Sequence, residues 1–352
     1  MRFALALLVY SIATCSAVEL LVSAETVLDA GSSTTAETVR VRGRLRCNAS
    51  SSSTTVLRTS RVIIESGGSF ECGMNSSDFE LQLLDNSSYS SVNNLRRGII
   101  VYPGGTLSLH GDASRGRIAR LASVAASGAS TLNLRSPGVG GVWHVGDALV
   151  IATTSFNIQP SIGQNEERTI AAVSDDGMRV ELDRPLAFSH YGGEPATFTG
   201  SNLTLDEAAY VANLRRNIRI HAAPGAAVGG HVIVHRGASA FVQGVEISGL
   251  GDEGTFGQYP FHWHRAGNVS GQYIINSTIH HTRQRCIVVH GTTDAVVESN
   301  TCFDIVGHGI FLEDHDEVAN NISHNLVILS RKANPATVRA RTWAELPRAT
   351  AS

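Results

Sequence analysis

The segment Phe261-His262-Trp263-His264 decides the fold, because segments of the same pattern recur along the chain at nearly constant spacing. One precedes it, Val232-Ile233-Val234-His235, and two follow it, Ile287-Val288-Val289-His290 and Ile310-Phe311-Leu312-Glu313. The last residues of successive segments lie 29, 26 and 23 positions apart. Repeats of this length, built from short strands, are typical of the coils of a parallel β-helix.

A second marker repeats with a similar period, at Asn276, Asn300 and Asn325, which are 24 and 25 positions apart. Stacked asparagines at a turn satisfy one another's amides, so we expect a structural ladder and not a functional site. Helical periodicity is confined to residues 207–216, and short alternating strands punctuated by Gly, Asn and Asp dominate elsewhere. The sequence therefore predicts an all-β protein.

Charge and hydropathy argue against several classes of partner. Charged residues make up 17% of the chain and the formal net charge is −3, whereas typical domains are roughly 25% charged. We therefore expect no binding to nucleic acid or to an anionic membrane surface. No stretch reaches about eighteen uninterrupted apolar residues, so we expect no membrane span.

The amino terminus predicts export. An apolar run from Phe3 to Tyr10 is followed by small residues up to Ala17, after which we expect a signal peptidase to cleave. Removal of Cys15 leaves an even number of cysteines, which is consistent with an oxidising compartment. Asn-x-Ser/Thr sequons predict N-glycosylation at seven positions, Asn48, Asn75, Asn86, Asn202, Asn268, Asn276 and Asn321. We expect a secreted, extracellular glycoprotein.

Several segments resemble a known family. Residues 39–45 and 62–70 are similar to the eight-glycine (G8) domain of fibrocystin-like proteins and of cell-migration-inducing, hyaluronan-binding proteins. Three further segments resemble the β-helix signatures of that family, at residues 259–264, 289–292 and 307–314. The resemblance covers about residues 20 to 330. It implies a β-rich G8 domain followed by a right-handed parallel β-helix.

We divide the chain accordingly into five segments: a signal peptide (1–17), a G8-like domain (18–112), an intermediate β-rich region (113–216), the parallel β-helix repeats (217–330) and a divergent tail (331–352). Cys47 and Cys72 fall at the ends of neighbouring strands of the G8-like segment, and we expect them to form a disulfide. Cys286 and Cys302 belong to one coil, and their pairing stays open.

The repeated strands place a row of polar side chains on one outer face. Their first and third residues are apolar and should face the interior of the coil, so the fourth faces outward. His235, His264, His290 and Glu313 then form a row with about 4.8 Å between neighbours. Such a row suits divalent-metal binding or general acid–base chemistry on a bound sugar, with a solvated polar face as the plain alternative.

We assign these roles residue by residue. The predicted ligands of a divalent metal ion, whose identity stays open, are His264, His290 and Glu313. The predicted catalytic residues are His262, His308 and Asp314. His262 or His308 completes the ligand shell of the metal or serves as acid or base, and Asp314 orients a ligand histidine. The neighbouring pair His280 and His281 falls at a corner, where we expect both side chains to be solvated.

Two functions follow from the resemblance, and they belong to different classes. The hyaluronan-degrading relatives imply binding or depolymerisation of an extracellular polysaccharide, as a hydrolase would perform it. The fibrocystin branch implies a non-catalytic adhesion or binding module, and a truncated form that keeps the fold without the function is a third alternative. Exposed Trp or Tyr side chains would favour sugar binding, and the candidates are Trp143, Tyr191, Tyr259 and Tyr273.

Overall fold

The computed structural model describes residues 17–47, 53–73, 78–85, 97–112, 118–135, 143–156 and 162–334. Within these residues the regular structure consists of β-strands and one short 3-10 helix, η2 (Ile162–Gln164). This confirms the all-β prediction. No helix in this part of the chain is long and apolar enough to cross a membrane. Residues 1–16 of the predicted signal peptide, the sequons at Asn48, Asn75 and Asn86, and the tail from residue 335 lie outside the described residues.

Three parallel sheets enclose one interior, and we call them sheets A, B and C. Sheet A contains β1 (Ala17–Val22), β3 (Ser33–Val41), β6 (Arg61–Ile64), β9 (Gly98–Val101), β20 (His231–His235), β23 (Phe261–Asn268), β26 (Ile287–Thr293) and β29 (Ile310–Leu312). Sheet B contains β2 (Glu25–Leu28), β4 (Arg44–Cys47), β7 (Ser69–Cys72), β10 (Thr106–His110), β21 (Ser239–Gln243), β24 (Tyr273–Ile275), β27 (Val296–Glu298) and β30 (Asn321–Ser323). Sheet C begins with the first residues of β3 and continues through β5 (Thr55–Thr59), β8 (Phe79–Leu83), β19 (Ile218–Ala222), β22 (Val245–Ser248), β25 (Thr278–His280), β28 (Thr301–Val306) and β31 (Leu326–Arg331).

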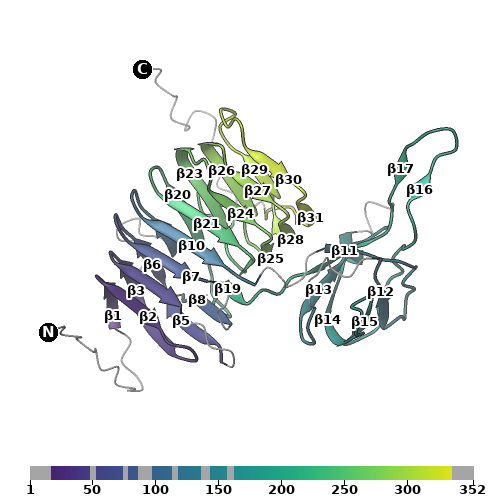
Figure 1. Ribbon diagram of the computed structural model, residues 1–352, viewed down its shortest axis with the longest axis horizontal. Coiled ribbons are helices and arrows are strands. Elements are labelled where there is room, and N and C mark those ends of the chain that lie inside the picture. Colours follow the sequence, from purple (N-terminus) through teal and green to yellow (C-terminus); the bar gives the residue numbers. More distant parts are fainter. Residues whose placement is uncertain are drawn as a thin grey trace.

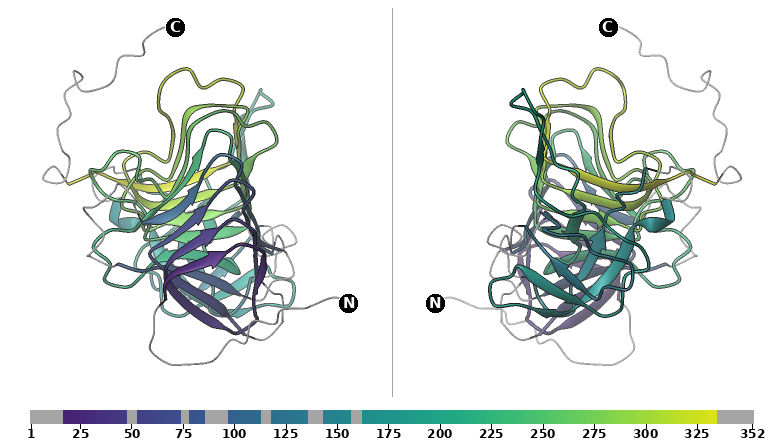
Figure 2. Two further views of the ribbon diagram at one scale, coloured as in Figure 1. Left: turned by 90° about the vertical axis from the view of Figure 1, so that its left-hand side faces the viewer. Right: turned by 90° about the vertical axis from the view of Figure 1, so that its right-hand side faces the viewer.

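The chain visits the three sheets in turn, once per coil, so the fold is a parallel β-helix. Sheet B has eight strands, one for each coil. Figure 1 shows the coils stacked from β1 to β31, and the left view of Figure 2 shows them from the end nearest β1, one behind another. The coils before β20 belong to the same stack, although the repeat that we detected in the sequence begins only at Val232.

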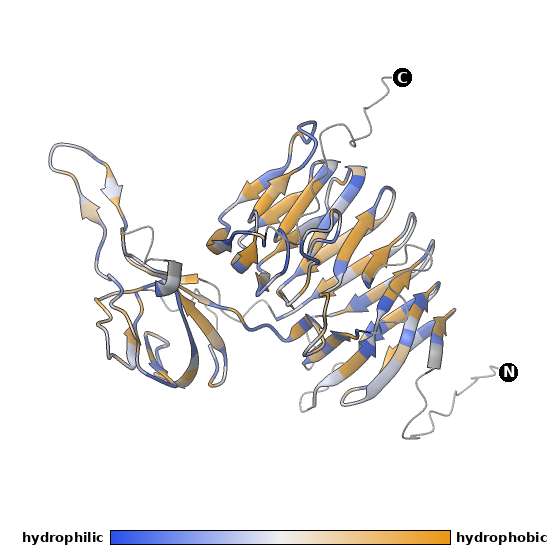
Figure 3. Ribbon diagram, turned by 180° about the vertical axis from the view of Figure 1, so that it is seen from behind, coloured by the Kyte–Doolittle hydropathy of each residue, from blue (hydrophilic) through white to orange (hydrophobic). Residues whose placement is uncertain are grey.

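Apolar side chains fill the interior of the coils, as the alternating pattern predicts. The central inward row of sheet A is fully buried and consists of Val41, Ile64, Val101, Val234, Trp263 and Val289. Apolar residues recur along the strands of all three sheets (Figure 3). Leu312 holds the same position in the last described coil and is 39% exposed, because no described coil lies beyond it.

The asparagine ladder is present for Asn300 and Asn325, but Asn276 is not part of it. Asn300 is fully buried and donates from its side-chain amide to Oδ1 of Asn325 at 3.0 Å. The backbone N–H of Ser277 donates to Oδ1 of Asn300 at 3.0 Å, so Ser277, and not Asn276, occupies the next position. Asn276 sits one residue earlier, at a corner with φ of 51°, a conformation that asparagine tolerates better than most residues.

Both pairs of cysteines in the described chain form disulfides. Cys47 and Cys72 end adjacent strands of sheet B with Cα atoms 4.9 Å apart, which confirms the predicted bridge. Cys286 and Cys302 are joined across one coil with Cα atoms 6.2 Å apart. Disulfides of this kind are typical of proteins that fold in an oxidising compartment.

Between β10 and β19 the chain leaves the stack and forms a separate lobe (Figure 1). Its antiparallel sheet contains six strands, β11 (Ile118–Arg120), β12 (Thr131–Asn133), β13 (Ala148–Ile151), β14 (Glu166–Val173), β15 (Arg179–Leu182) and β18 (Tyr210–Asn213). A hairpin of β16 (Ala196–Thr197) and β17 (Thr204–Leu205) extends from this lobe. The lobe has its own apolar core and contacts sheet C through a small cluster, Val150, Ala212, Leu214, Phe303 and Ile328.

The periodicity of residues 207–216 indicated a helix, and this was wrong, because the segment contains strand β18. Val211 belongs to the core of the lobe, and its neighbour Ala212 belongs to the cluster that contacts sheet C. Both side chains are fully buried. A strand buried on both faces has no alternation of apolar and polar residues, so its pattern cannot be told from that of a short buried helix.

Candidate functional site

The predicted histidine row on sheet A is present in the predicted register. His235 pairs with His264, and His264 pairs with His290, on consecutive coils. Glu313 continues the row, because its backbone N–H donates to the carbonyl of Val289 at 3.1 Å. The row extends one coil further back than we predicted, since the ring of Tyr102 stacks on His235 with centroids 5.4 Å apart and planes within 9°.

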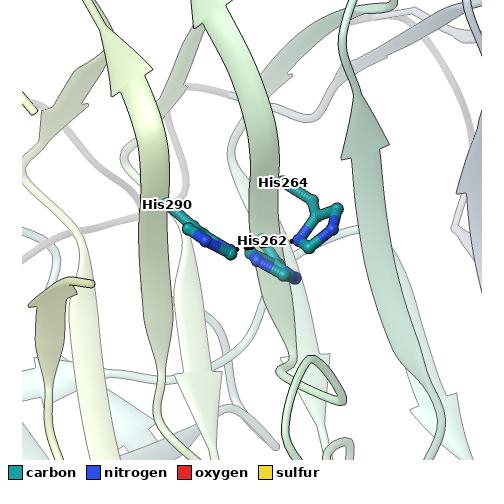
Figure 4. Close-up of side chains that lie close together, drawn as sticks. All are labelled: His262, His264 and His290. Atoms are coloured by element: carbon teal, nitrogen blue, oxygen red, sulfur yellow. Dashed lines mark hydrogen bonds between the residues drawn. The ribbon is translucent and has the colours of Figure 1, made fainter. Parts of the chain in front are cut away.

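Three imidazoles of this face converge: those of His262, His264 and His290 (Figure 4). Nδ1 of His264 lies 3.1 Å from Nδ1 of His290. The ring of His262 stacks on that of His290 with centroids 5.8 Å apart and stands edge-on to His264 at 4.9 Å. One ring nitrogen from each residue lies within 4.8 Å of the other two, so the three side chains form one cluster.

His262 is fully buried, although the alternation along the strand predicts that it lies on the same outer face as the row. The loop before β23 folds over it, and the ring of Tyr259 covers His262 with centroids 4.8 Å apart. Among the described residues neither ring nitrogen of His262 has a hydrogen-bond partner of good geometry, although the Gly257 carbonyl faces the ring. Burial, reinforced by the nearby His264 and His290, holds the pKa of His262 well below its usual value.

The two half-buried members of the cluster, His264 and His290, differ in their partners. Burial is the main reason that the pKa of His264 falls to about 4, and the neighbouring His290 lowers it further. His290 contacts both acids at the end of the row: its Nε2 lies 2.8 Å from Asp314 Oδ2, and its Nδ1 lies 3.5 Å from Glu313 Oε2. At neutral pH His264 is therefore uncharged, while His290 lies between two carboxylates.

Glu313 is held by two side chains that the sequence analysis did not assign to the site. The hydroxyl of Tyr259 donates to Glu313 Oε1 at 2.8 Å, and Arg285 Nη1 lies 3.3 Å from the same oxygen. Arg285 also donates to the Tyr259 hydroxyl at 3.2 Å. Burial, followed by the charge of Glu313, raises the pKa of Tyr259, so the hydroxyl remains a donor.

A third unassigned residue, Glu317, fixes the turn that carries the acids. Its Oε1 accepts the backbone N–H groups of Gly291, Glu313 and Asp314 at 2.9, 3.2 and 2.7 Å. These hydrogen bonds explain why the pKa of Glu317 is lowered even though burial opposes the shift. No periodic pattern marks Glu317, because it lies in a turn and not in a repeated strand.

His308 is not part of the imidazole cluster. Its ring packs on Phe311 with centroids 4.6 Å apart, and the side chain is exposed. Arginines border the cluster instead: Arg265 Nε lies 3.4 Å from His290 Nε2, and the Arg285 guanidinium lies 3.9 Å from the centre of the Phe311 ring. The face therefore combines neutral imidazoles, carboxylates and guanidinium groups.

We expected His280 and His281 to be solvated, but both side chains contact other residues. His280 is 7% exposed, and its Nε2 lies 3.4 Å from Glu246. The two rings meet with their Nδ1 atoms 2.7 Å apart. This pair lies on sheet C beside the lobe, since His281 Nε2 is 3.0 Å from Glu167 of β14. It is therefore part of the contact between the two bodies and not of the site on sheet A.

Two family models match the chain, one for each part of the stack. Residues 13–122 match the G8 domain, and residues 227–350 match the CEMIP beta-helix. The chain combines a G8 domain with a CEMIP β-helix. The imidazole cluster lies within the CEMIP β-helix segment. The two matched segments form one continuous stack, because β20 of the second pairs directly with β9 of the first.

Proteins with similar sequences are much longer than this chain. A G8 domain-containing protein of Dictyostelium discoideum is 33% identical over 232 residues, which are 65% of this chain and 19% of that protein. Fibrocystin-L of Mus musculus is 30% identical over 290 residues, 69% of this chain and 7% of fibrocystin-L. The chain thus spans less than a fifth of either relative.

Among solved structures, a tailspike of Acinetobacter baumannii bacteriophage AP22, determined with a capsular saccharide, aligns with 81% of this chain and 53% of its own. The sequence identity is 11% and the TM-score is 0.21. A tailspike of Pseudomonas phage LKA1 gives similar values, with 14% identity and a TM-score of 0.22. We draw no conclusion from similarities this low.

Proposed function

We propose that this protein is exported and binds an extracellular acidic polysaccharide of the hyaluronan type along the outer face of sheet A. The observation that carries the proposal is the composition of the site. Imidazoles on consecutive coils are bordered by Arg265 and Arg285, both within hydrogen-bonding range of the row. Guanidinium groups recognise carboxylates in a planar geometry, and imidazole nitrogens accept or donate hydrogen bonds to hydroxyl groups.

The exposure of the aromatic side chains favours the row on sheet A as the place where a sugar binds. Trp143 and Tyr259 are 5% and 1% exposed, so they offer no open surface for a sugar. Tyr191 is 45% exposed but lies on the lobe. The stacked Tyr102 and His235 are half-buried and lie on the row itself. A polysaccharide on this face would therefore contact a strip of rings that runs across the coils.

Depolymerisation of the bound polysaccharide is the second candidate function, favoured by the placement of His290 between Glu313 and Asp314. Cleavage of a glycosidic bond requires groups that donate and accept protons on either side of it. Two carboxylates and an imidazole at one end of the row supply groups of that kind. In this proposal Glu313 exchanges protons with the sugar, and Asp314 orients His290.

Export has its own support. Both disulfides lie in the stack, and the sequon residues Asn202, Asn268 and Asn321 are exposed. Enzymatic deglycosylation of protein collected from the medium of secreting cells should shift its mass. A product of unchanged mass, or one that stays inside the cell, would contradict the proposal that the protein is an exported glycoprotein.

Binding is tested by titrating the secreted protein with hyaluronan and with neutral dextran. Arg265→Asn should weaken hyaluronan binding about tenfold, a loss of roughly 1.4 kcal/mol, and asparagine tolerates the φ of 48° at this position. Arg179→Gln, an equal loss of charge on the lobe, is the matched control and should bind normally. Equal affinity for dextran, or equal losses in both variants, would contradict the proposed site. The same samples, analysed for shortened hyaluronan chains, distinguish a depolymerase from an adhesion module.

A further inference from the structure

We propose that His262, His264 and His290 together bind one divalent transition-metal ion, with zinc as the expected occupant. This site goes beyond the binding of polysaccharide proposed above, and its occupancy does not depend on that function. The ligand set differs from the set that we predicted from sequence, because His262 takes the place that we had assigned to Glu313.

The separation of the nitrogen atoms fits a shared ion. Ligand nitrogens placed tetrahedrally at 2.0–2.1 Å from zinc lie about 3.3 Å from one another. The Nδ1 atoms of His264 and His290 are 3.1 Å apart. The contributing nitrogen of His262 lies within 4.8 Å of both, so a rotation of that ring completes a three-histidine set. Three protein ligands leave a fourth position open for water or substrate.

The burial of His262 gives an independent reason. Buried side-chain nitrogens nearly always have a hydrogen-bond partner, because an unsatisfied polar group in the interior costs free energy. His262 is fully buried beneath Tyr259, and in the described part of the chain neither of its ring nitrogens has a partner of good geometry, although the Gly257 carbonyl faces the ring. A metal ion in the cluster would satisfy one of them. His262 faces the two other imidazoles, as Figure 4 shows.

Asp314 supplies the kind of support that metal-binding histidines usually have. Histidine ligands commonly donate their second N–H to a carboxylate, which fixes the tautomer and the orientation of the ring. Asp314 Oδ2 lies 2.8 Å from Nε2 of His290, on the side of the ring away from His264. If Nε2 carries the proton, the lone pair is on Nδ1, which faces the cluster. Arg265 Nε lies 3.4 Å from the same nitrogen, and because both groups are then donors it makes no hydrogen bond to His290 in this tautomer.

The chemistry of the ligands selects the class of metal. Imidazole nitrogens suit zinc, copper, nickel and iron, whereas calcium and magnesium prefer oxygen ligands. The carboxylate of Glu313 is 3.5 Å from His290 and is occupied by Tyr259 and Arg285. It is therefore placed beside the ion, where it could accept a proton from a bound water, and not among the ligands.

The experiment measures metal content and needs no polysaccharide. The secreted full-length chain is treated with chelator, reloaded with zinc, dialysed and analysed for bound metal. We expect about one zinc ion per chain, a higher melting temperature with zinc than without it, and, after loading with cobalt, the visible absorption of four-coordinate Co(II). Less than about a tenth of an equivalent of zinc in the wild-type protein would overturn the proposal.

Substitutions inside and outside the three-histidine cluster show whether the zinc is bound at this site. His264→Ala and His290→Ala alter partly exposed side chains and should remove most of the zinc and its effect on melting. His235→Ala lies on the same row, one coil earlier and outside the cluster, and should retain both. Full zinc in His264→Ala, or an equal loss in His235→Ala, would overturn the assignment. A protein that holds zinc without binding hyaluronan would refute only the proposed function.

Discussion

Glu167 of the lobe and His281 of the β-helix form an ion pair, with Oε2 and Nε2 3.0 Å apart. His281 follows β25 on sheet C, and Glu167 lies in β14. The hydrogen bond to Glu167 raises the pKa of His281, and the same bond lowers the pKa of Glu167. Asp304 also faces His281, at 3.9 Å.

This pair makes the contact of the lobe with the stack depend on pH. The contribution of His281 is complete below its unfolded pKa of about 6.5 and is lost as the pH rises through its raised folded pKa. The contribution of Glu167 is present above its unfolded pKa and is lost as the pH falls through its lowered folded pKa. We expect the contact to be strongest at mildly acidic pH, by less than about 1 kcal/mol because both side chains are more than a third exposed.

Hydrogen exchange of the amides of β14, followed from pH 5 to pH 8 after correction for intrinsic rates, measures this dependence. Protection should fall toward pH 8 in the wild-type protein, and His281→Ala should flatten the profile. A wild-type profile that the substitution leaves unchanged would show that the pair does not control the contact.

Asn300 should be the most sensitive position of the polar ladder. Its side chain makes hydrogen bonds to Ser277, Asn325 and the Ile274 carbonyl while fully buried. Asn300→Ala leaves these groups without partners, and we expect a loss of about 2–4 kcal/mol in the free energy of unfolding. Chemical denaturation measures the loss. Asn276→Gly, which keeps the positive φ, should change stability by less than about 1 kcal/mol, and equal losses would mean that the ladder has been assigned wrongly.

The hydroxyl of Tyr259 should couple energetically to Glu313. Tyr259→Phe removes a buried hydrogen bond to that carboxylate and should cost about 1–2 kcal/mol of stability. A double-mutant cycle with Glu313→Gln isolates the interaction, and we expect a coupling energy of about 1 kcal/mol. Additive effects of the two substitutions would show that the hydroxyl does not hold the carboxylate in solution.

The bridge between Cys286 and Cys302 should contribute about 3 kcal/mol, because it closes a loop of 16 residues. The double variant Cys286→Ala/Cys302→Ala should unfold at correspondingly lower denaturant, measured without reductant. In the wild-type protein, alkylation under non-reducing conditions should label neither residue. Labelling of both would contradict the bridge.

The sequence predicted the row on sheet A because one pattern repeats there: apolar residues alternate with polar ones on consecutive coils. His264 and His290 were placed in register on that basis alone. The burial of His262 could not be predicted, because it depends on how the loop containing Tyr259 folds, and no periodicity describes that loop. Ser277 could not be predicted for a related reason. The ladder was recognised from repeated asparagines, but at this coil the backbone N–H and the hydroxyl of a serine make the equivalent hydrogen bonds.

The lobe leaves and re-enters the stack at almost the same point. The side-chain oxygen of Asn217, at the re-entry, accepts the backbone N–H of Asp112, at the exit, at 2.7 Å. Until the lobe folds, bringing these two residues together closes a loop of about a hundred residues, an entropic cost of about 4 kcal/mol. Strand β19 must nevertheless lie between β8 and β22 before sheet C is continuous. Folding of the lobe removes this cost and so favours assembly of the stack across the junction. A lobe that folds slowly would leave two incomplete stacks whose unpaired strand edges are exposed to neighbouring chains.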